Sequence, residues 1–150
     1  MGMKKLYVAA VVYLILGLSA GVFYREFTRV FDGAGGNTQL NTLHTHLMSL
    51  GVLFFLIALL LERSFRLSAH PNFTLWFWLH NIALFWTIGF MTANGIVHAT
   101  GNGEAWTAMW SGLAGVGHIL LTVSFALFFV ILGKRVRIAG YRDAQAPEAA

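Results

Sequence analysis

Four long apolar runs, separated by short polar segments, dominate the pattern of this chain. Each run is long enough to cross the roughly 30 Å hydrocarbon core of a bilayer as a helix. We expect spans at about residues 6–24, 40–61, 73–98 and 106–132. Because the connections are short, consecutive spans should lie antiparallel. The pattern predicts an all-α fold, an integral membrane up-down four-helix bundle within residues 1–138, followed by a disordered Ala/Gln/Pro/Glu-rich tail at 139–150.

Composition agrees with a membrane protein of one domain. Of the 150 residues, 57% are hydrophobic and only 11% are charged, whereas a soluble domain carries roughly 25% charged residues. Cysteine is absent, which excludes disulfides, iron–sulfur clusters, thiolate haem ligands and cysteine-type zinc sites. A net charge of +4 would suggest a nucleic-acid partner for a soluble protein. Here the basic residues flank the apolar runs, so we expect a lipid bilayer and no nucleic acid.

The distribution of basic residues predicts the orientation of the chain. Eight fall on one side of the predicted spans: Lys4, Lys5, Arg63, Arg66, Lys134, Arg135, Arg137 and Arg142. Only Arg25 and Arg29 fall on the other side. The positive-inside rule then places both termini in the cytoplasm, for a multi-pass protein of the cell inner (plasma) membrane. Trp76 and Trp78, at the start of the third span, are expected to form an interfacial belt.

Histidines begin the second span, where an ionisable side chain costs about 2–3 kcal/mol or more unless something binds it. Helical spacing puts His44, Met48 and Gly51 on one stripe. His46 points roughly 200° away from His44, so the two imidazoles cannot face one partner. One should face the bundle interior. The other should face a neighbouring helix, another protomer or the aqueous rim.

Histidines of three different spans are expected at a similar depth. By helix rise, His44, His46 and His118 lie roughly 6–12 Å inside the outer edge of the membrane, and His98 lies close to that edge. His80 stands apart in the inner half. Three or four imidazoles therefore gather in the outer half of the bilayer, which favours a bound cofactor over isolated packing histidines.

A b-type haem fits this group of residues, because it takes imidazoles from facing helices and needs small neighbours. We expect His44 and His118 as axial ligands, His46 as the next choice, and His98 at the outer edge. Small residues sit beside the proposed ligands, namely Gly51, Gly115 and Ser111. Arg25 and Arg29, one helical turn apart, are candidate partners of the haem propionates. Met48 is expected to be a core packing residue rather than an axial ligand.

Several alternatives remain open. The same histidines could bind copper or zinc, or they could line a polar pocket of a cofactor-free interaction or channel-like protein. With haem, the function would be electron transfer, redox or gas sensing, or haem handling, and a redox partner would follow. No catalytic residue is assigned. Gly17 and Gly21 form a small-residue face, which allows close helix packing within the chain or a homo-oligomer.

Two resemblances support the haem hypothesis and the fold. The stretch Leu43–Gly51, Leu-His-Thr-His-Leu-Met-Ser-Leu-Gly, resembles the second helix of subunit I of haem–copper oxidases, where a histidine near the helix start ligates haem iron. The remaining oxidase helices and the copper-ligand region have no counterpart here. Over about residues 5–133, the chain resembles an uncharacterised family of small four-helix bacterial membrane proteins. The matching stretches are Tyr13–Gly17, Gly21–Phe27, the His44/His46 segment and Ser111–His118.

Overall fold

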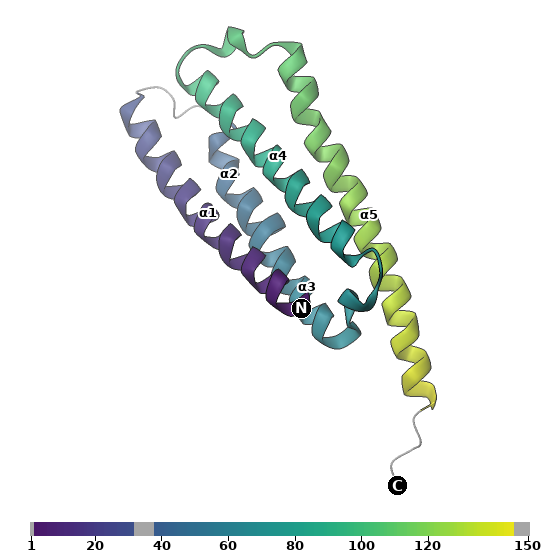
Figure 1. The fold of residues 1–150 in the computed structure, drawn as a ribbon. Coiled ribbons are helices and arrows are strands. Elements are labelled where there is room, and N and C mark those ends of the chain that lie inside the picture. Colours follow the sequence, from purple (N-terminus) through teal and green to yellow (C-terminus); the bar gives the residue numbers. More distant parts are fainter. Residues whose placement is uncertain (1, 32–37, 146–150) are drawn as a thin grey trace.

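The fold consists of four long helices in a computed structural model that describes residues 2–31 and 38–145. These are α1 (Gly2–Val30), a second helix (Leu40–Phe65), α4 (Phe73–Ala99) and α5 (Ala108–Gln145), shown in Figure 1. The second helix comprises α2 (Leu40–His46), a π-helical segment η1 (Leu47–Leu53) and α3 (Phe54–Phe65). Short 3₁₀ turns, η2 (Leu67–Ala69) and η3 (Gly103–Ala105), lie in the connections. All four long helices are long and apolar enough to cross a membrane, which confirms the all-helical prediction.

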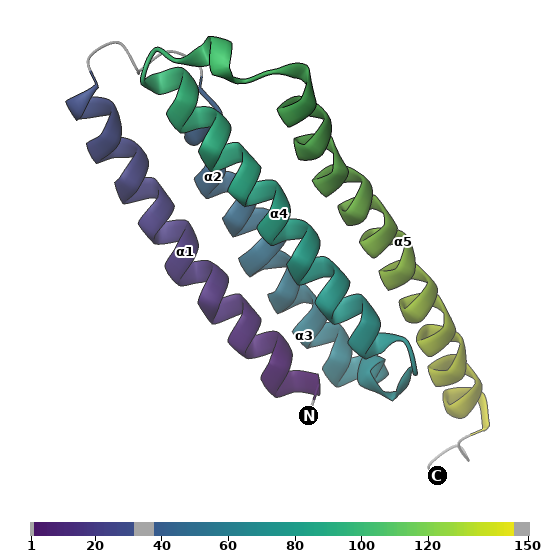
Figure 2. The same cartoon turned by 45° about the horizontal axis from the view of Figure 1, so that its top comes forward.

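The helices pair in chain order. α1 packs along the whole second helix, and α4 packs along α5. The second helix lies between these outer elements, so α1 and α5 occupy opposite edges of the molecule (Figures 1 and 2). α5 contacts α3 through Phe128, whose ring lies 5.1 Å from that of Phe54, and through Arg135, whose Nε donates to the Phe65 carbonyl. At the end that carries η3, α5 diverges from α4 (Figure 2). The bundle is therefore tightly packed at one end and opened at the other.

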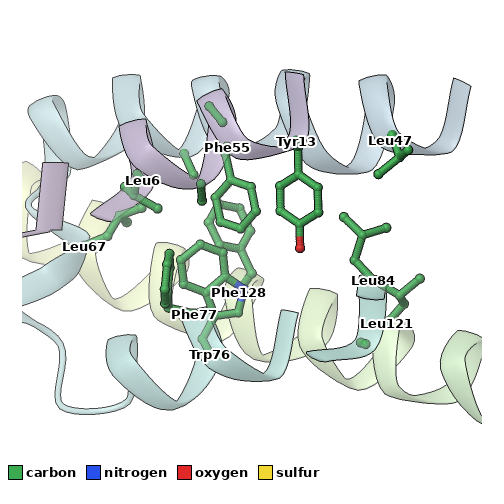
Figure 3. Packing of buried hydrophobic residues seen from close by; sticks show 14 of the residues in the cluster. Leu6, Tyr13, Leu47, Phe55, Leu67, Trp76, Phe77, Leu84, Leu121 and Phe128 are labelled. Atoms are coloured by element: carbon green, nitrogen blue, oxygen red, sulfur yellow. The ribbon is translucent and has the colours of Figure 1, made fainter. Parts of the chain in front are cut away.

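The tightly packed end holds an aromatic core around Phe55, Trp76 and Phe128, as seen in Figure 3. Tyr13 stacks on Phe55 with ring centroids 5.7 Å apart, and Trp76 lies 5.0 Å from Phe128. Trp76 is completely buried, whereas Trp78 is 56% exposed. The expected interfacial belt is thus wrong for Trp76. The two indoles are two residues apart on a helix, so they point in different directions. Trp76 shares the inward face with His80, four positions later.

Two helices extend further than the hydrophobic pattern predicts. α1 continues past Tyr24 to Val30, so its charged segment is helical. α5 continues past Leu132 to Gln145, which corrects the expected disorder for residues 139–145. The C-terminal segment contains good helix formers and no proline before Pro147, which explains this extension. Residues 146–150 and the glycine-rich segment at residues 32–37 lie outside the described residues.

His80 of α4 forms hydrogen bonds to the π-helical segment of the second helix and to α5, and so connects three helices. In a π-helix the backbone hydrogen bonds shift register, which changes the carbonyl groups available to other partners. His80 Nε2 lies 3.1 Å from the carbonyl oxygen of Leu50, and Nδ1 lies 3.1 Å from Ser124 Oγ. Because a carbonyl only accepts, Nε2–H donates to Leu50 and Nδ1 accepts from the Ser124 hydroxyl. Both ring nitrogens are satisfied with the imidazole neutral.

Candidate functional site

A cavity of about 670 Å³ lies between α2, α4 and α5, where α5 diverges from the rest of the bundle. Its size falls within the range of roughly 300–1,000 Å³ typical of small-molecule and cofactor sites. Three histidines from three helices line it, namely His46 of α2, His98 of α4 and His118 of α5. The other lining residues are Thr38, Gln39, Thr42, Thr87, Phe90, Met91, Asn94, Trp106, Ser111, Ala114 and Gly115. The cavity therefore combines imidazoles, hydroxyls and aromatic rings.

Backbone carbonyls orient two of these imidazoles. His46 Nδ1 lies 2.9 Å from the carbonyl oxygen of Thr42, and His98 Nδ1 lies 2.9 Å from that of Asn94. Since a carbonyl only accepts, Nδ1 carries the hydrogen in both rings and Nε2 carries the lone pair. Within residues 2–31 and 38–145, neither Nε2 has a hydrogen-bond partner. A histidine that donates Nδ1–H to a carbonyl and leaves Nε2 free has the arrangement typical of metal-ligating histidines.

The third imidazole, His118, is exposed to the cavity. In the part of the chain that the structure describes, its ring nitrogens form no hydrogen bond. The preceding residue, Gly117, is the point of closest approach between α5 and α4. A Cβ atom there would lie 2.5 Å from Thr87 Oγ1 and 3.2 Å from Thr87 Cα. With Gly117 held against α4, the next residue is rotated by about 100°, and His118 enters the cavity.

Small side chains enlarge the cavity on the α5 side. Ser111 and Gly115 lie two turns and one turn before His118, and both line the cavity. A Cβ atom at Gly115 would meet nothing within 4 Å, so this glycine borders open space. At Gly95, the α4 backbone instead approaches Leu40 of α2 so closely that a Cβ atom there would collide with the Leu40 side chain. Gly95 thus allows close contact between α4 and α2, and Gly117 allows close contact between α5 and α4. Gly115 leaves open space on the cavity side of α5.

His44 lies on the opposite side of the second helix from the cavity. Its Nδ1–H donates to the Gly17 carbonyl over 2.7 Å, and its ring lies 3.4 Å from the position that a Cβ atom of Gly21 would take. Met48 Sδ lies 3.0 Å from the corresponding position at Gly17. The expected opposition of His44 and His46 is therefore observed, with His44 facing the neighbouring helix. The structure brings His46, rather than His44, into one cavity with His118.

The remaining residue of the His44 stripe also faces α1. A Cβ atom at Gly51 would lie 2.6 Å from Tyr13 Cγ, so Gly51 accommodates the Tyr13 ring and does not border the cavity. The Gly17/Gly21 face is likewise covered by the second helix of the same chain. Its close packing is used within the chain, and a homo-oligomer through this face stays a prediction.

The two arginines expected near the propionates belong to α1, and no α1 residue lines the cavity. Both pair with Glu26 instead. Arg25 Nε lies 3.6 Å and Arg29 Nη1 lies 3.3 Å from the Glu26 carboxylate oxygens. Their side chains are 76% and 68% exposed. The structure therefore separates these arginines from the three cavity histidines.

The cavity histidines do not converge on one point. Among the described residues, no group of three His, Asp or Glu side chains is arranged to hold a single metal ion. Thr38 Oγ1, at the cavity, is buried without a hydrogen-bond partner in those residues. The arrangement suits a ligand broader than an ion, which imidazoles approach from different helices and a hydroxyl meets at one edge.

Apart from His98, the residues of the α4 wall of the cavity were not singled out by the sequence pattern. Thr87, Met91, Asn94 and His98 all line the cavity, and their spacing of four, three and four residues defines one face of a helix. This stripe could have been recognised from the polar residues Thr87 and Asn94 beside His98. The stripe is hard to recognise in the sequence because the phenylalanines and leucines of the third span dominate the hydrophobic pattern.

Comparisons with known proteins define the family but not the activity. The comparison with curated proteins finds no match, and neither does the comparison with solved structures. The likeness of the second span to haem–copper oxidase subunit I is not addressed by these comparisons and stays a prediction. One family model, "Protein of unknown function (DUF2871)", matches residues 3–135. Since this match covers nearly all of the four helices, the chain belongs to the DUF2871 family of proteins of unknown function.

Proposed function

We propose that this chain is an integral membrane protein that binds haem b in the cavity between α2, α4 and α5. In this proposal His46 and His118 are the axial ligands, and His98 lies at the outer edge of the site. The observation that carries the proposal is the presence of three imidazoles, from three helices, in one cavity of about 670 Å³. The α5 ligand is the one that the sequence suggested, and the second-helix ligand moves from His44 to His46.

The state of the imidazoles supports ligation. A ligand nitrogen must be unprotonated, and a hydrogen bond from the other ring nitrogen to a carbonyl raises its basicity. His46 and His98 both have this bond, at 2.9 Å. His80 provides the contrast, because both of its nitrogens are already bonded. The cavity histidines combine an open cavity with an available nitrogen. His44 also has an Nε2 without a partner among the described residues, but it does not line the cavity.

The shape and lining of the cavity favour haem over one copper or zinc ion. An ion needs ligands within about 2.0–2.2 Å of one point, and the described residues offer no such triad. A macrocycle needs apolar and small neighbours with a polar edge. Phe90, Met91 and Trp106 supply the apolar wall, Gly115 supplies space, and Thr38 and Ser111 supply hydroxyls. Those hydroxyls are the candidate partners of the propionates, in place of Arg25 and Arg29.

The chemistry of bound haem fits a small carrier or sensor. A haem held by His46 and His118 would supply one-electron exchange or gas binding at its iron. The proposed roles are electron transfer, redox or gas sensing, or haem handling. The distribution of basic residues supports an orientation with both termini in the cytoplasm of the inner membrane. The cavity would then lie toward the outer leaflet, within reach of an external redox partner.

Purification from haem-replete cells tests the proposal. We expect one haem b per chain by the pyridine haemochrome assay, with a Soret band that sharpens and shifts on reduction by dithionite. His46→Ala and His118→Ala should each lower haem content by tenfold or more. His44→Ala should keep full occupancy. It is a matched control because it removes an imidazole two residues from His46, on the face that contacts α1.

Circular dichroism and gel filtration of each variant separate ligand loss from misfolding. Restoration of the spectrum of the His118→Ala protein by added imidazole would confirm a vacated coordination position. Full haem occupancy in both cavity variants would contradict the ligand assignment. A colourless protein with stoichiometric copper or zinc by elemental analysis would replace haem with a metal-ion site. A colourless protein without metal would indicate a cofactor-free membrane protein.

A further inference from the structure

A second hollow, of about 820 Å³, lies between α1 and α4 and contains none of the six histidines. Both helices pack on the second helix. They meet each other at Tyr13 and Asn81, and a groove remains between them. Lys4 and Lys5 line one end of the groove. The rest of its lining is almost entirely aliphatic or aromatic, including Val8, Val12, Leu16, Trp78, Ile82, Phe85 and Trp86.

The length of this groove matches one leaflet of a bilayer. Along α1 it extends from Lys4 to Leu16, which corresponds to about 18 Å of helix rise. Half of the hydrocarbon core of a bilayer is roughly 15 Å. A smaller hollow, of about 230 Å³, continues in the same direction and shares Tyr13, Leu16 and Phe85 with the first. An acyl chain with its headgroup at the lysines would therefore lie along the groove.

The polar groups inside the groove are already paired with each other. Tyr13 Oη donates to Asn81 Oδ1 over 3.1 Å, and Asn81 Nδ2 donates to the Phe77 carbonyl over 2.6 Å. A ligand that needs hydrogen bonds at this depth, such as a quinone head, would have to compete with them. The charged groups are instead the ammonium groups of Lys4 and Lys5, at the end of the groove. There the two exposed ammonium groups have no carboxylate within salt-bridge distance among the described residues.

We infer that the groove between α1 and α4 is a binding site for one anionic phospholipid of the adjacent leaflet. Lys4 and Lys5 bind the phosphate, and the acyl chains occupy the apolar groove. Charge complementarity selects the headgroup, because basic side chains at a membrane surface attract anionic lipids. The long stems of the lysines let the ammonium groups reach the headgroup level while their methylenes pack on the groove. This site is independent of the haem proposal, since the two hollows share no residue.

Native mass spectrometry of the full chain in detergent tests the inference, with phosphatidylglycerol and phosphatidylcholine as probes in separate titrations. The wild-type protein should acquire one phosphatidylglycerol at a concentration about tenfold below that needed for phosphatidylcholine. Lys4→Gln/Lys5→Gln should raise the phosphatidylglycerol concentration about tenfold and leave the phosphatidylcholine value unchanged. Val12→Trp, which places a bulky ring in the groove at an exposed position, should weaken binding of both lipids.

Lys134→Gln/Arg137→Gln is the matched control, because it removes two exposed positive charges on α5 outside the groove. It should bind phosphatidylglycerol like the wild type. Equal affinity for the two lipids, or unchanged binding in the Lys4/Lys5 variant, would overturn the inference. So would a stable adduct with ubiquinone that phosphatidylglycerol does not displace. Circular dichroism of each variant checks that the helices are intact, and haem content reports separately on the other cavity.

Discussion

His80 and the cavity histidines are the same side chain in the same bundle, yet they differ in burial and in the number of bonded ring nitrogens. His80 is completely buried, with both nitrogens bonded, and lies 4.5 Å from the ring of Phe54 and 5.3 Å from that of Phe55 by centroids. His46, His98 and His118 border open space, and two of them have a fixed tautomer with a free Nε2. Depth in the membrane alone therefore does not identify a ligand. The proposed ligands differ from His80 in having an unsatisfied nitrogen, and they differ from His44 in lining the cavity.

This contrast extends to the two ends of the molecule. At the end around His80, aromatic rings from three helices pack against the imidazole. At the end around His118, α5 diverges and glycine or serine replaces larger side chains. A close-packed end can anchor the helices while the open end exchanges a ligand, because the anchoring contacts are not disturbed. The variants below test whether stability and binding are divided in this way.

The largest effect should come from His80→Ala. The variant leaves the Leu50 carbonyl and the Ser124 hydroxyl without their partner and opens a cavity among aromatic rings. We expect a loss of about 3–5 kcal/mol in the free energy of unfolding, measured by denaturant titration in detergent with circular dichroism. His70→Ala, in the connection after η2, should change it by less than about 0.5 kcal/mol. A loss under 1 kcal/mol for His80→Ala would show that this imidazole does not anchor the bundle.

A pair of glycines on α5 sharpens the comparison within one helix. Gly117→Ala places a Cβ atom 2.5 Å from Thr87 Oγ1 and should force α4 and α5 apart. We expect destabilisation of about 1–3 kcal/mol. Gly115→Ala meets nothing within 4 Å, and the higher helix propensity of alanine should stabilise the protein by up to about 1 kcal/mol. Thermal unfolding of both variants measures the difference, and equal shifts would contradict the close approach at Gly117.

Ser124→Ala tests one hydrogen bond of the anchored histidine. It removes the hydroxyl that donates to His80 Nδ1 over 3.1 Å. Hydrogen bonds between membrane helices contribute on average about 0.6 kcal/mol and at most about 1.7 kcal/mol, so the loss should lie between these values. Thr122→Ala is a suitable control, because the Thr122 hydroxyl bonds only the His118 carbonyl of its own helix. Equal losses for the two variants would mean that the bond to His80 carries no special weight.

His118→Ala should have the smallest effect on stability. In protein purified from haem-deficient cells, no hydrogen bond of its ring is lost and no cavity forms in the core. The free energy of unfolding should change by less than about 0.5 kcal/mol, while haem binding by the reconstituted protein is abolished. Destabilisation comparable with that of His80→Ala would remove the distinction between anchoring and ligating histidines.

The sequence predicted the helices well because apolar runs and charged ends are local signals. It also predicted that His44, His46 and His118 lie at a similar depth, with His98 nearer the outer edge, since helix rise converts residue number into depth. It favoured His44 over His46 as the partner of His118, whereas the structure places His46 in the cavity with His118. That choice depends on the rotation of the second helix about its axis, which the packing of Gly17 and Gly21 against His44 and Met48 determines. The sequence did not predict that His80 bonds the Leu50 carbonyl, because no residue pattern indicated the π-helical segment to which Leu50 belongs.

The length of α5 has a practical consequence. Its 38 residues correspond to about 57 Å of helix rise, whereas a bilayer with its headgroups measures roughly 40–45 Å. A helix that begins at one surface of the membrane therefore protrudes from the other by two to three turns. This protruding rod is rigidly continuous with the wall that carries His118. A fluorophore or spin label attached near Tyr141 would therefore lie outside the membrane. Its displacement would report a tilt of α5 upon ligand binding.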